Sequence, residues 1–228
     1  MNLLTTLFPL LCWFGYNLVV PLIEKRRPSL SVIMSMQRRR WVANAAGRES
    51  PLDAILSANL MGSVSFLAST AVLLILAVFT VFGQLPAVME SLSTIAQRNY
   101  SVQEVQIHLA VMLAMFVLSF FAFTLALRQF NHFCIMVGAM DHSGRITKEE
   151  IDAIAMLNTL GAQNFNNGIR GYYFSVATVA WFASEWLAVI VSLVTVGFLV
   201  HREFFSSGHR IAASAAVIAS RRDQETPS

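Results

Sequence analysis

The chain has 228 residues, of which 56% are hydrophobic and 13% are charged, and its mean hydropathy is +0.59. A water-soluble domain cannot bury so large an apolar share in one core, so the composition excludes a soluble globular protein and predicts an integral membrane protein. The formal net charge of +3 comes with basic runs at 25–27 and 38–40. Beside membrane-spanning segments such runs are typical of topology determinants and lipid-facing anchors, and we expect no binding to nucleic acid.

The first apolar segment, residues 3–23, is long enough to cross a bilayer core of about 30 Å, which takes roughly 20 helical residues. Its basic residues follow it at 25–27, whereas those of a cleavable signal peptide precede the apolar stretch. We therefore expect this segment to stay in the mature protein as a membrane helix.

Residues 29–46 are predicted to form a short helix along the inner membrane interface. Arg38, Arg39 and Arg40 stand beside Trp41, an aromatic residue of the kind that favours the headgroup zone. These four residues are candidates for binding anionic lipid headgroups at the cytoplasmic face.

Two long helices are expected next. Ser50-Pro51-Leu52-Asp53 combines an N-cap serine, a proline at the first helical position and an acid in the first turn, so one helix begins near residue 51 and runs to 83. At 1.5 Å per residue it is about 50 Å long and extends beyond the membrane into the cytoplasm. After a short helix over 86–98, the capping box Ser101-Val102-Gln103-Glu104 opens a second long helix over 102–140.

The last third of the chain contains one further capping box, Thr147-Lys148-Glu149-Glu150, which opens a short cytoplasmic helix over 148–162. A polar stretch separates it from a membrane helix over 171–200, and residues 206–228 are predicted as a polar tail. The predicted fold is therefore all-α. It is a polytopic membrane protein with four transmembrane helices, cytoplasmic helical extensions and short interfacial helices, forming a single bundle over 1–205.

Lysine and arginine counts predict the orientation, because positive charge is retained on the cytoplasmic side. Seven such residues lie between the first and second apolar segments, one between the second and third, and three between the third and fourth. This pattern places the N-terminus outside, the basic connections in the cytoplasm and the C-terminus outside. The tail weakens the assignment, since its four arginines at 202, 210, 221 and 222 would face the exterior.

Polar residues gather near the predicted cytoplasmic boundary of these helices. The candidates for lining a pore or binding a ligand there are Asn59, Ser63, Arg128, Asn131, His132, Asn164, Asn167 and Arg170. An unpaired buried amide costs on the order of 1–3 kcal/mol, so we expect these side chains to face one another inside the bundle.

Two interpretations of this polar layer remain open. In the first, the polar side chains only staple the helices together, and Gly168 and Gly171 let the chain turn and pack tightly. In the second, they line a water-filled vestibule in which Arg128 and Arg170 attract an anion or a lipid headgroup.

Glu185 is the one acid inside an apolar run and is a further candidate, because an intramembrane carboxylate is by default a functional-site hypothesis. If the helix over 171–200 overhangs inward, Glu185 lies at the inner interface beside two tryptophans. If Tyr172 marks the boundary, the carboxylate lies deep in the membrane and can carry protons or bind a cation.

No catalytic residue, metal site or cofactor is expected. The five histidines show no ligand spacing, and Cys12 and Cys134 stand alone in apolar surroundings. The sequence also contains no phosphate-loop or dinucleotide-binding motif.

Three stretches carry a resemblance to a known family: RRRW at 38–41, SANLMGSVSFLASTAVLL at 57–74 and NFNNGIRGYYFSVATVAWF at 164–182. They resemble a family of multi-pass membrane proteins of bacteria and plants that is known only as a domain of unknown function. The resemblance covers most of the chain and implies a protein of the bacterial inner membrane. It supplies no activity and no site residues.

The leading functional hypothesis is a non-enzymatic bundle that assembles as a homo-oligomer and lets a small ion or solute pass. An oligomer is required because one four-helix bundle is too thin to hold an aqueous pore. The alternative is an accessory, scaffold or lipid-binding subunit of a membrane complex.

Overall fold

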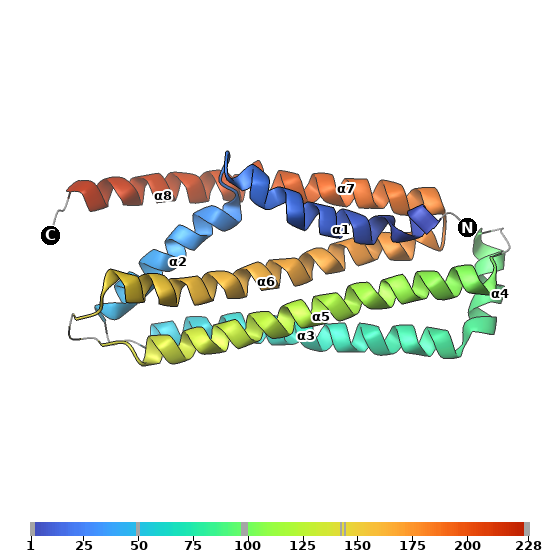
Figure 1. The fold of residues 1–228 in the computed structure, drawn as a ribbon, viewed down its shortest axis with the longest axis horizontal. Helices are drawn as coiled ribbons and strands as arrows, with labels where there is room; N and C mark the ends of the chain where they lie inside the picture. The colour runs from blue at the N-terminus through green and yellow to red at the C-terminus, as the bar shows by residue number, and fades with distance from the viewer. Residues whose placement is uncertain (1–2, 49–50, 97–99, 142, 144, 226–228) are drawn as a thin grey trace. The chain divides into compact units, whose positions relative to one another are not determined.

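The computed structural model describes residues 3–48, 51–96, 100–141, 143 and 145–225. Within these ranges the chain is helical and contains no strand, which confirms the predicted all-α class (Figure 1). The helices are α1 (Leu3–Glu24), α2 (Leu30–Ala46), α3 (Leu52–Gly83), α4 (Leu85–Ala96), α5 (Val102–Gly138), α6 (Lys148–Trp181), α7 (Glu185–Phe204) and α8 (Ser207–Glu225).

Four segments of the described chain are long and apolar enough to cross a membrane. They are Leu3–Glu24, Leu52–Gly83, Val102–Gly138 and Glu185–Arg221, the last of which covers α7 and most of α8. The protein is therefore a polytopic α-helical membrane protein, as its composition predicted.

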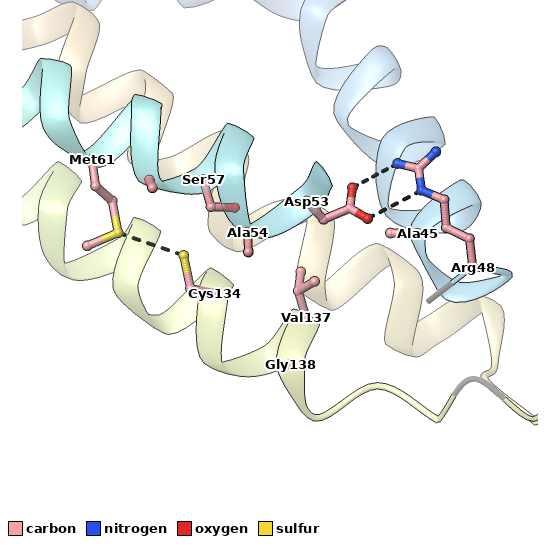
Figure 2. A pocket seen from close by; sticks show the side chains of 10 residues that line it. Ala45, Arg48, Asp53, Ala54, Ser57, Met61, Cys134, Val137 and Gly138 are labelled. Atoms are coloured by element: carbon pink, nitrogen blue, oxygen red, sulfur yellow. Dashed lines mark hydrogen bonds and ion pairs between the residues drawn. The ribbon is translucent and has the colours of Figure 1, made fainter. Parts of the chain in front are cut away.

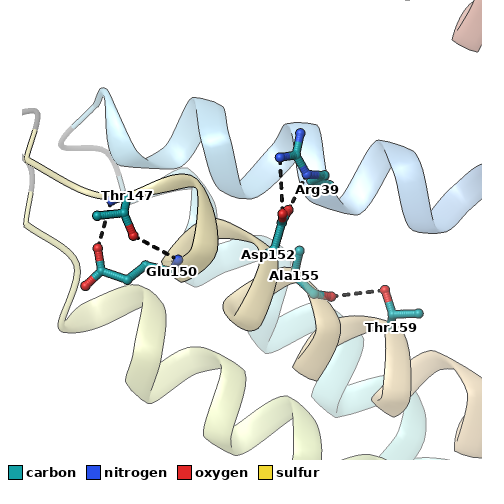
Figure 3. A network of polar contacts seen from close by, with 6 residues as sticks. All are labelled: Arg39, Thr147, Glu150, Asp152, Ala155 and Thr159. Atoms are coloured by element: carbon teal, nitrogen blue, oxygen red, sulfur yellow. Dashed lines mark hydrogen bonds and ion pairs between the residues drawn. The ribbon is translucent and has the colours of Figure 1, made fainter.

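Local capping explains where three of the helices begin. The Ser101 hydroxyl accepts a hydrogen bond from the Glu104 N–H at 3.2 Å, and the Glu104 carboxylate accepts one from the Ser101 N–H at 2.9 Å. Thr147 and Glu150 exchange the same pair of bonds at the start of α6, at 3.2 and 2.8 Å (Figure 3). Ser29 caps α2 by accepting from the Val32 N–H at 3.3 Å. Both predicted capping boxes are thus confirmed, while the predicted N-cap Ser50 lies outside the described residues.

The main correction to the sequence prediction concerns α6, which runs without a break through all 34 residues from Lys148 to Trp181. The predicted separation of a short helix over 148–162 from a membrane helix over 171–200 is absent. The chain breaks instead at 182–184 and continues as α7 from Glu185. A helix tolerates isolated glycines at about 1 kcal/mol each, so packing contacts can keep such a stretch helical.

The chain divides into two compact units. Unit 1 comprises Met1–Val19, Val64–Thr124 and Asn164–Gly197, and unit 2 comprises Val20–Ser63, Leu125–Gln163 and Phe198–Ser228. Fourteen of the sixteen lysines and arginines belong to the segments of unit 2, and only Arg98 and Arg170 belong to those of unit 1. Positive charge is therefore concentrated in one unit. The single bundle over 1–205 stays a prediction.

Unit 1 is built around Trp181, which is 1% exposed. The buried apolar residues that form this cluster are Val78, Leu85, Tyr100, Val105, Leu109, Met112, Phe116, Trp181 and Ala188. The Tyr100 hydroxyl donates a hydrogen bond to the Phe182 carbonyl at 3.2 Å. This bond fixes the turn between α6 and α7 against the residues that lead into α5.

Two glycines let α6 lie close against α5 in unit 1. A Cβ atom added at Gly168 would lie 2.5 Å from the ring of Phe123, and one added at Gly171 would lie 2.1 Å from the Ser119 hydroxyl oxygen. Phe123 and Ser119 are both fully buried. Small residues are the usual means by which membrane helices approach so closely. The predicted tight packing at these glycines is present, whereas the predicted chain turn is not.

Unit 2 brings the predicted polar tail back to the first basic connection. The tail is helical over the described part of α8 and packs on α2. The Nε2 atom of His209 lies 3.1 Å from the Pro28 carbonyl oxygen, and Arg27 donates to the Phe204 carbonyl at 3.3 Å. The sequence prediction placed these two segments on opposite sides of the membrane. In the structure the two segments are in direct contact, and the orientation of the chain in the membrane stays a prediction.

Replacing Gly168 by alanine is expected to lower the free energy of unfolding by about 1–3 kcal/mol, because overpacking against Phe123 outweighs the gain in helix propensity. The measurement is the thermal midpoint in mild detergent. Gly197→Ala is the matched control, since a Cβ atom there would meet nothing within 4 Å. Equal midpoints for the two variants would contradict the close packing of α5 on α6.

Candidate functional site

The polar cluster of unit 1 is centred on Arg170 of α6. Its Nη1 atom donates to the Asn17 side-chain oxygen at 2.9 Å and to the Asn167 side-chain oxygen at 3.4 Å. Its guanidinium carbon lies 4.9 Å from the centroid of the Tyr16 ring, a cation–π contact. Trp13 donates its indole N–H to the Asn167 carbonyl at 3.3 Å. Residues of α1 and α6 thus hold the guanidinium jointly.

Two members of this cluster, Arg170 and Asn167, are candidates that the sequence predicts, whereas Asn17 and Tyr16 are not. The available signal was that Asn17 is the only amide side chain in the apolar run 3–23. A polar residue in such a run has to find a partner on a neighbouring helix. Asn164, the remaining candidate in unit 1 on α6, is half-buried.

Glu185 occupies the first position of α7, and its carboxylate accepts a hydrogen bond from the Thr5 hydroxyl at 3.0 Å. Both sequence interpretations assumed one unbroken helix over 171–200, and the break at 182–184 removes that assumption. A carboxylate at a helix N-terminus is stabilised by the unpaired N–H groups and the positive end of the helix dipole. Glu185 therefore serves the junction of α1 with α7, and a ligand-binding role for it stays a prediction.

His108 of α5 is a buried polar residue to which the sequence assigned no role. It is 0% exposed, its Nε2 atom lies 2.7 Å from the Thr178 carbonyl oxygen, and its ring stacks on Trp181 with centroids 4.1 Å apart. The Nδ1 atom of His108 and the indole nitrogen of Trp181 have no hydrogen-bond partner among the described residues. Within those residues no group of three or more His, Cys, Asp and Glu side chains is placed to hold a metal ion.

The candidates of unit 2 lie on α3 and α5, and all of them are exposed on the single chain: Asn59, Ser63, Arg128, Asn131 and His132. The Cys134 sulfur lies 3.7 Å from the Met61 sulfur, which fixes the register of α3 against α5 (Figure 2). At 1.5 Å per residue, Ser63 and His132 lie within about one helical turn of this contact. These two candidates therefore share a level, and pore lining by them stays a prediction.

A charged group that the sequence analysis did not select stands at the start of α3. Asp53 accepts hydrogen bonds from the Trp41 indole at 2.5 Å and from Arg48 at 2.8 and 3.3 Å. The Asp53 side chain is 8% exposed and that of Arg48 is 37% exposed. Both residues border a cavity of about 360 Å³ between the ends of α2, α3 and α5 (Figure 2), lined by Ala45, Arg48, Asp53, Ala54, Ser57, Ala58, Met61, Cys134, Val137 and Gly138.

Arg39, one of the predicted lipid-headgroup residues, forms a bidentate ion pair with Asp152 of α6 (Figure 3). The two side chains are 51% and 53% exposed. The hydrogen bond from Arg39 lowers the pKa of the Asp152 carboxyl below its ordinary value. The pair therefore stabilises the fold above the ordinary pKa of aspartate, and this contribution is lost as the pH falls through the lowered pKa. Solvent screening keeps the contribution small.

The other three headgroup candidates differ in their surroundings. Trp41 packs its ring on Phe133, with centroids 5.3 Å apart, in addition to its bond to Asp53. Arg38 is half-buried, and burial lowers the pKa of its guanidinium. Arg40 lines a groove between α2 and α8. Lipid recognition by these residues stays a prediction.

The chain is all-α and has four apolar segments long enough to span a membrane, and a single arginine, Arg170, is held between α1 and α6. These features define a multi-pass membrane protein. The chain belongs to the family described as protein of unknown function, DUF599, whose model matches residues 4–208. The match extends from α1 into the start of α8 and confirms the resemblance to an uncharacterised family. No curated protein and no solved structure matches the chain.

Replacing Asp53 by asparagine is expected to lower the thermal midpoint by several degrees. The substitution removes the negative charge of a buried side chain that accepts hydrogen bonds from Arg48 and Trp41, and it therefore weakens these bonds. Asp152→Asn is the matched control, since it removes a carboxylate whose ion pair is solvent-exposed and is expected to change the midpoint little. Thermal unfolding of both variants in the same detergent provides the measurement. A larger loss for Asp152→Asn than for Asp53→Asn would reverse the order that burial predicts.

Proposed function

We propose that the protein is a homo-oligomeric, channel- or transporter-like bundle that passes a small anion across the membrane. The observation that carries the proposal is the Arg170 guanidinium, which is oriented by the side-chain oxygens of Asn17 and Asn167 and by the Tyr16 ring. An arginine within the apolar part of a membrane protein is energetically expensive and marks an ion or substrate pathway by default. A positioned guanidinium among polar side chains supplies positive potential that attracts an anion.

The exposed polar residues of unit 2 support assembly with a second copy. Within the apolar 18-residue stretch of α3 that could span a membrane, only 22% of the residues are buried in the single chain, against 50% for the corresponding stretch of α5. Small residues follow the exposed side of α3 at helical spacing, namely Ala58, Gly62, Ser65 and Ser69. Such residues allow two membrane helices to approach closely, and a facing copy would also shield Asn59 and Ser63 from lipid.

The charge distribution supports an orientation with the N-terminus outside and the basic segments on the cytoplasmic side of a bacterial inner membrane. In this proposal α6 crosses the membrane in addition to the four apolar segments, since its 34 residues span about 50 Å. Five crossings bring the connection at 141–147 and α8 to the same side as α2, in agreement with the packing of α8 on α2. The arginines of the tail then obey the rule that positive charge stays inside.

A second candidate function is an accessory, scaffold or lipid-binding subunit of a membrane complex. The observation that favours it is the basic pair of helices formed by α2 and α8, which offers a surface at the ends of the membrane segments. This function predicts that a larger assembly or tightly held anionic lipid purifies with the protein. It also predicts no flux when the protein is reconstituted alone.

Anion and cation fluxes in proteoliposomes test the proposed function. Arg170→Ala is expected to lower the anion flux about tenfold, the change that corresponds to 1.4 kcal/mol of lost anion affinity. Arg170→Lys keeps the positive charge but loses the planar guanidinium, so an intermediate loss of anion flux is expected. Arg128→Ala is expected to lower the anion flux less than Arg170→Ala does. Arg145→Ala is the control, because Arg145 is exposed and pairs with Asp141 outside the apolar segments. A wild-type protein that is strictly monomeric in nanodiscs, or that carries no anion flux, would overturn the proposal.

Cysteine labelling tests the five crossings. Cys12 and Cys134 are first replaced by serine. Three proteins are then made from this background, each with a single cysteine at an exposed position: Lys25→Cys, Gln84→Cys and Ser214→Cys. In right-side-out vesicles an impermeant maleimide is expected to label only the Gln84→Cys protein. Labelling of the Ser214→Cys protein together with the Gln84→Cys protein would restore the four-crossing topology.

A further inference from the structure

A groove of about 310 Å³ lies between α2 and α8, within unit 2. Side chains of Ile33, Met36, Gln37 and Arg40 line it from α2, and Ala216 and Val217 are among those that line it from α8. Its volume falls at the lower end of the range of about 300–1,000 Å³ that is usual for small-molecule sites. The groove is thus large enough to receive part of an amphiphilic molecule.

The apolar side of the groove continues onto the surface of both helices. Met36 is 48% exposed and Val217 is 51% exposed, and the neighbouring Ile218 of α8 is 69% exposed. A helix pair that displays such apolar side chains beside arginines has the composition of an interfacial amphipathic element. The exposed surface is therefore suited to contact with acyl chains.

The charge of the two helices selects the kind of headgroup. α2 contains three arginines and no acidic residue. In α8, Arg210 precedes the part that lines the groove, and two arginines and two acidic residues follow it, so the charge of the groove itself comes from α2. Gln37 and Arg40 put hydrogen-bond donors on the α2 wall itself. A negatively charged group is the complement of this surface.

The position of the groove in the chain selects lipid over a soluble partner. α2 follows the C-terminal end of the apolar α1 after five residues, and α8 follows the end of α7 after two. Both helices are therefore tethered where membrane segments end, in the headgroup zone. Phospholipid is the abundant molecule at that level that combines an apolar chain with an anionic group.

We propose that the groove between α2 and α8 binds one anionic phospholipid, with an acyl chain against Met36 and Val217 and the phosphate beside Arg40. The site shares no residue with the Arg170 cluster, and the proposal does not depend on anion passage. It assigns to α8 the role of the second wall of a lipid site.

Native mass spectrometry of the full-length protein, released from detergent, tests the proposal with phosphatidylglycerol and phosphatidylcholine of identical acyl chains. The wild type is expected to retain phosphatidylglycerol at least about fivefold better than phosphatidylcholine, a difference close to 1 kcal/mol of binding energy. Ala216→Phe fills the groove and is expected to abolish retention of both lipids. Arg40→Gln leaves the apolar walls intact and is expected to reduce phosphatidylglycerol to the level of phosphatidylcholine.

The control variant is Ala215→Phe, which adds the same ring at an exposed position of α8 that does not line the groove. It is expected to retain lipid as the wild type does. Equal retention by Ala216→Phe and Ala215→Phe would overturn the proposal, and so would equal retention of the two lipids by the wild type. Glycerol phosphate serves as a probe of the headgroup alone, and binding of it as tight as that of the lipid would exclude an acyl-chain site. A change in dimer fraction in Ala216→Phe without loss of lipid would assign the groove to a second copy instead.

Discussion

The close contact between α5 and α6 is the constraint on which the candidate site depends. Gly168 and Gly171 face Phe123 and Ser119 in unit 1, and in unit 2 a Cβ atom added at Gly161 would lie 2.7 Å from the ring of Phe130. The pairs Gly161–Phe130 and Gly168–Phe123 are seven residues apart on both helices, so the contacts repeat after two turns. These contacts accompany a stretch rich in glycine and asparagine that is helical throughout, and within unit 1 the same helix presents Arg170 to α1.

Two charged groups of this apolar chain are held by side chains from outside their own helix. Arg170 of α6 is held by Asn17 and Tyr16 of α1, and Asp53 of α3 is held by Trp41 of α2 and by Arg48. The first cluster therefore links helices that are far apart in the sequence, whereas the second links the consecutive helices α2 and α3. The first cluster places a guanidinium beside the amide side chains of Asn17 and Asn167, whereas the second is built around the Asp53 carboxylate. This difference in chemistry is the reason the proposed function rests on Arg170.

Helix starts were predictable because they depend on neighbours in the chain. The boxes at Ser101 and Thr147 and the cap at Ser29 each satisfy backbone N–H groups within four residues, so their hydrogen bonds follow from the sequence directly. The end of α6 was not predictable in this way. Glycine and asparagine favour a break locally, and only the contacts with α5 override that preference. The same limit explains why Asn17 was missed, since nothing in its neighbourhood identifies Arg170 as its partner.

The sequence by itself determined that this is an all-α polytopic membrane protein with its positive charge concentrated in defined segments. Whether a segment can span a membrane depends on its own length and hydropathy, which are read directly from the sequence. Only the tertiary structure decided that α6 is continuous, that α8 returns to α2, and that Arg170 is held from α1. These features depend on which helix faces meet. Helix packing is set by the shapes of side chains far apart in the chain, and a list of apolar segments does not contain that information.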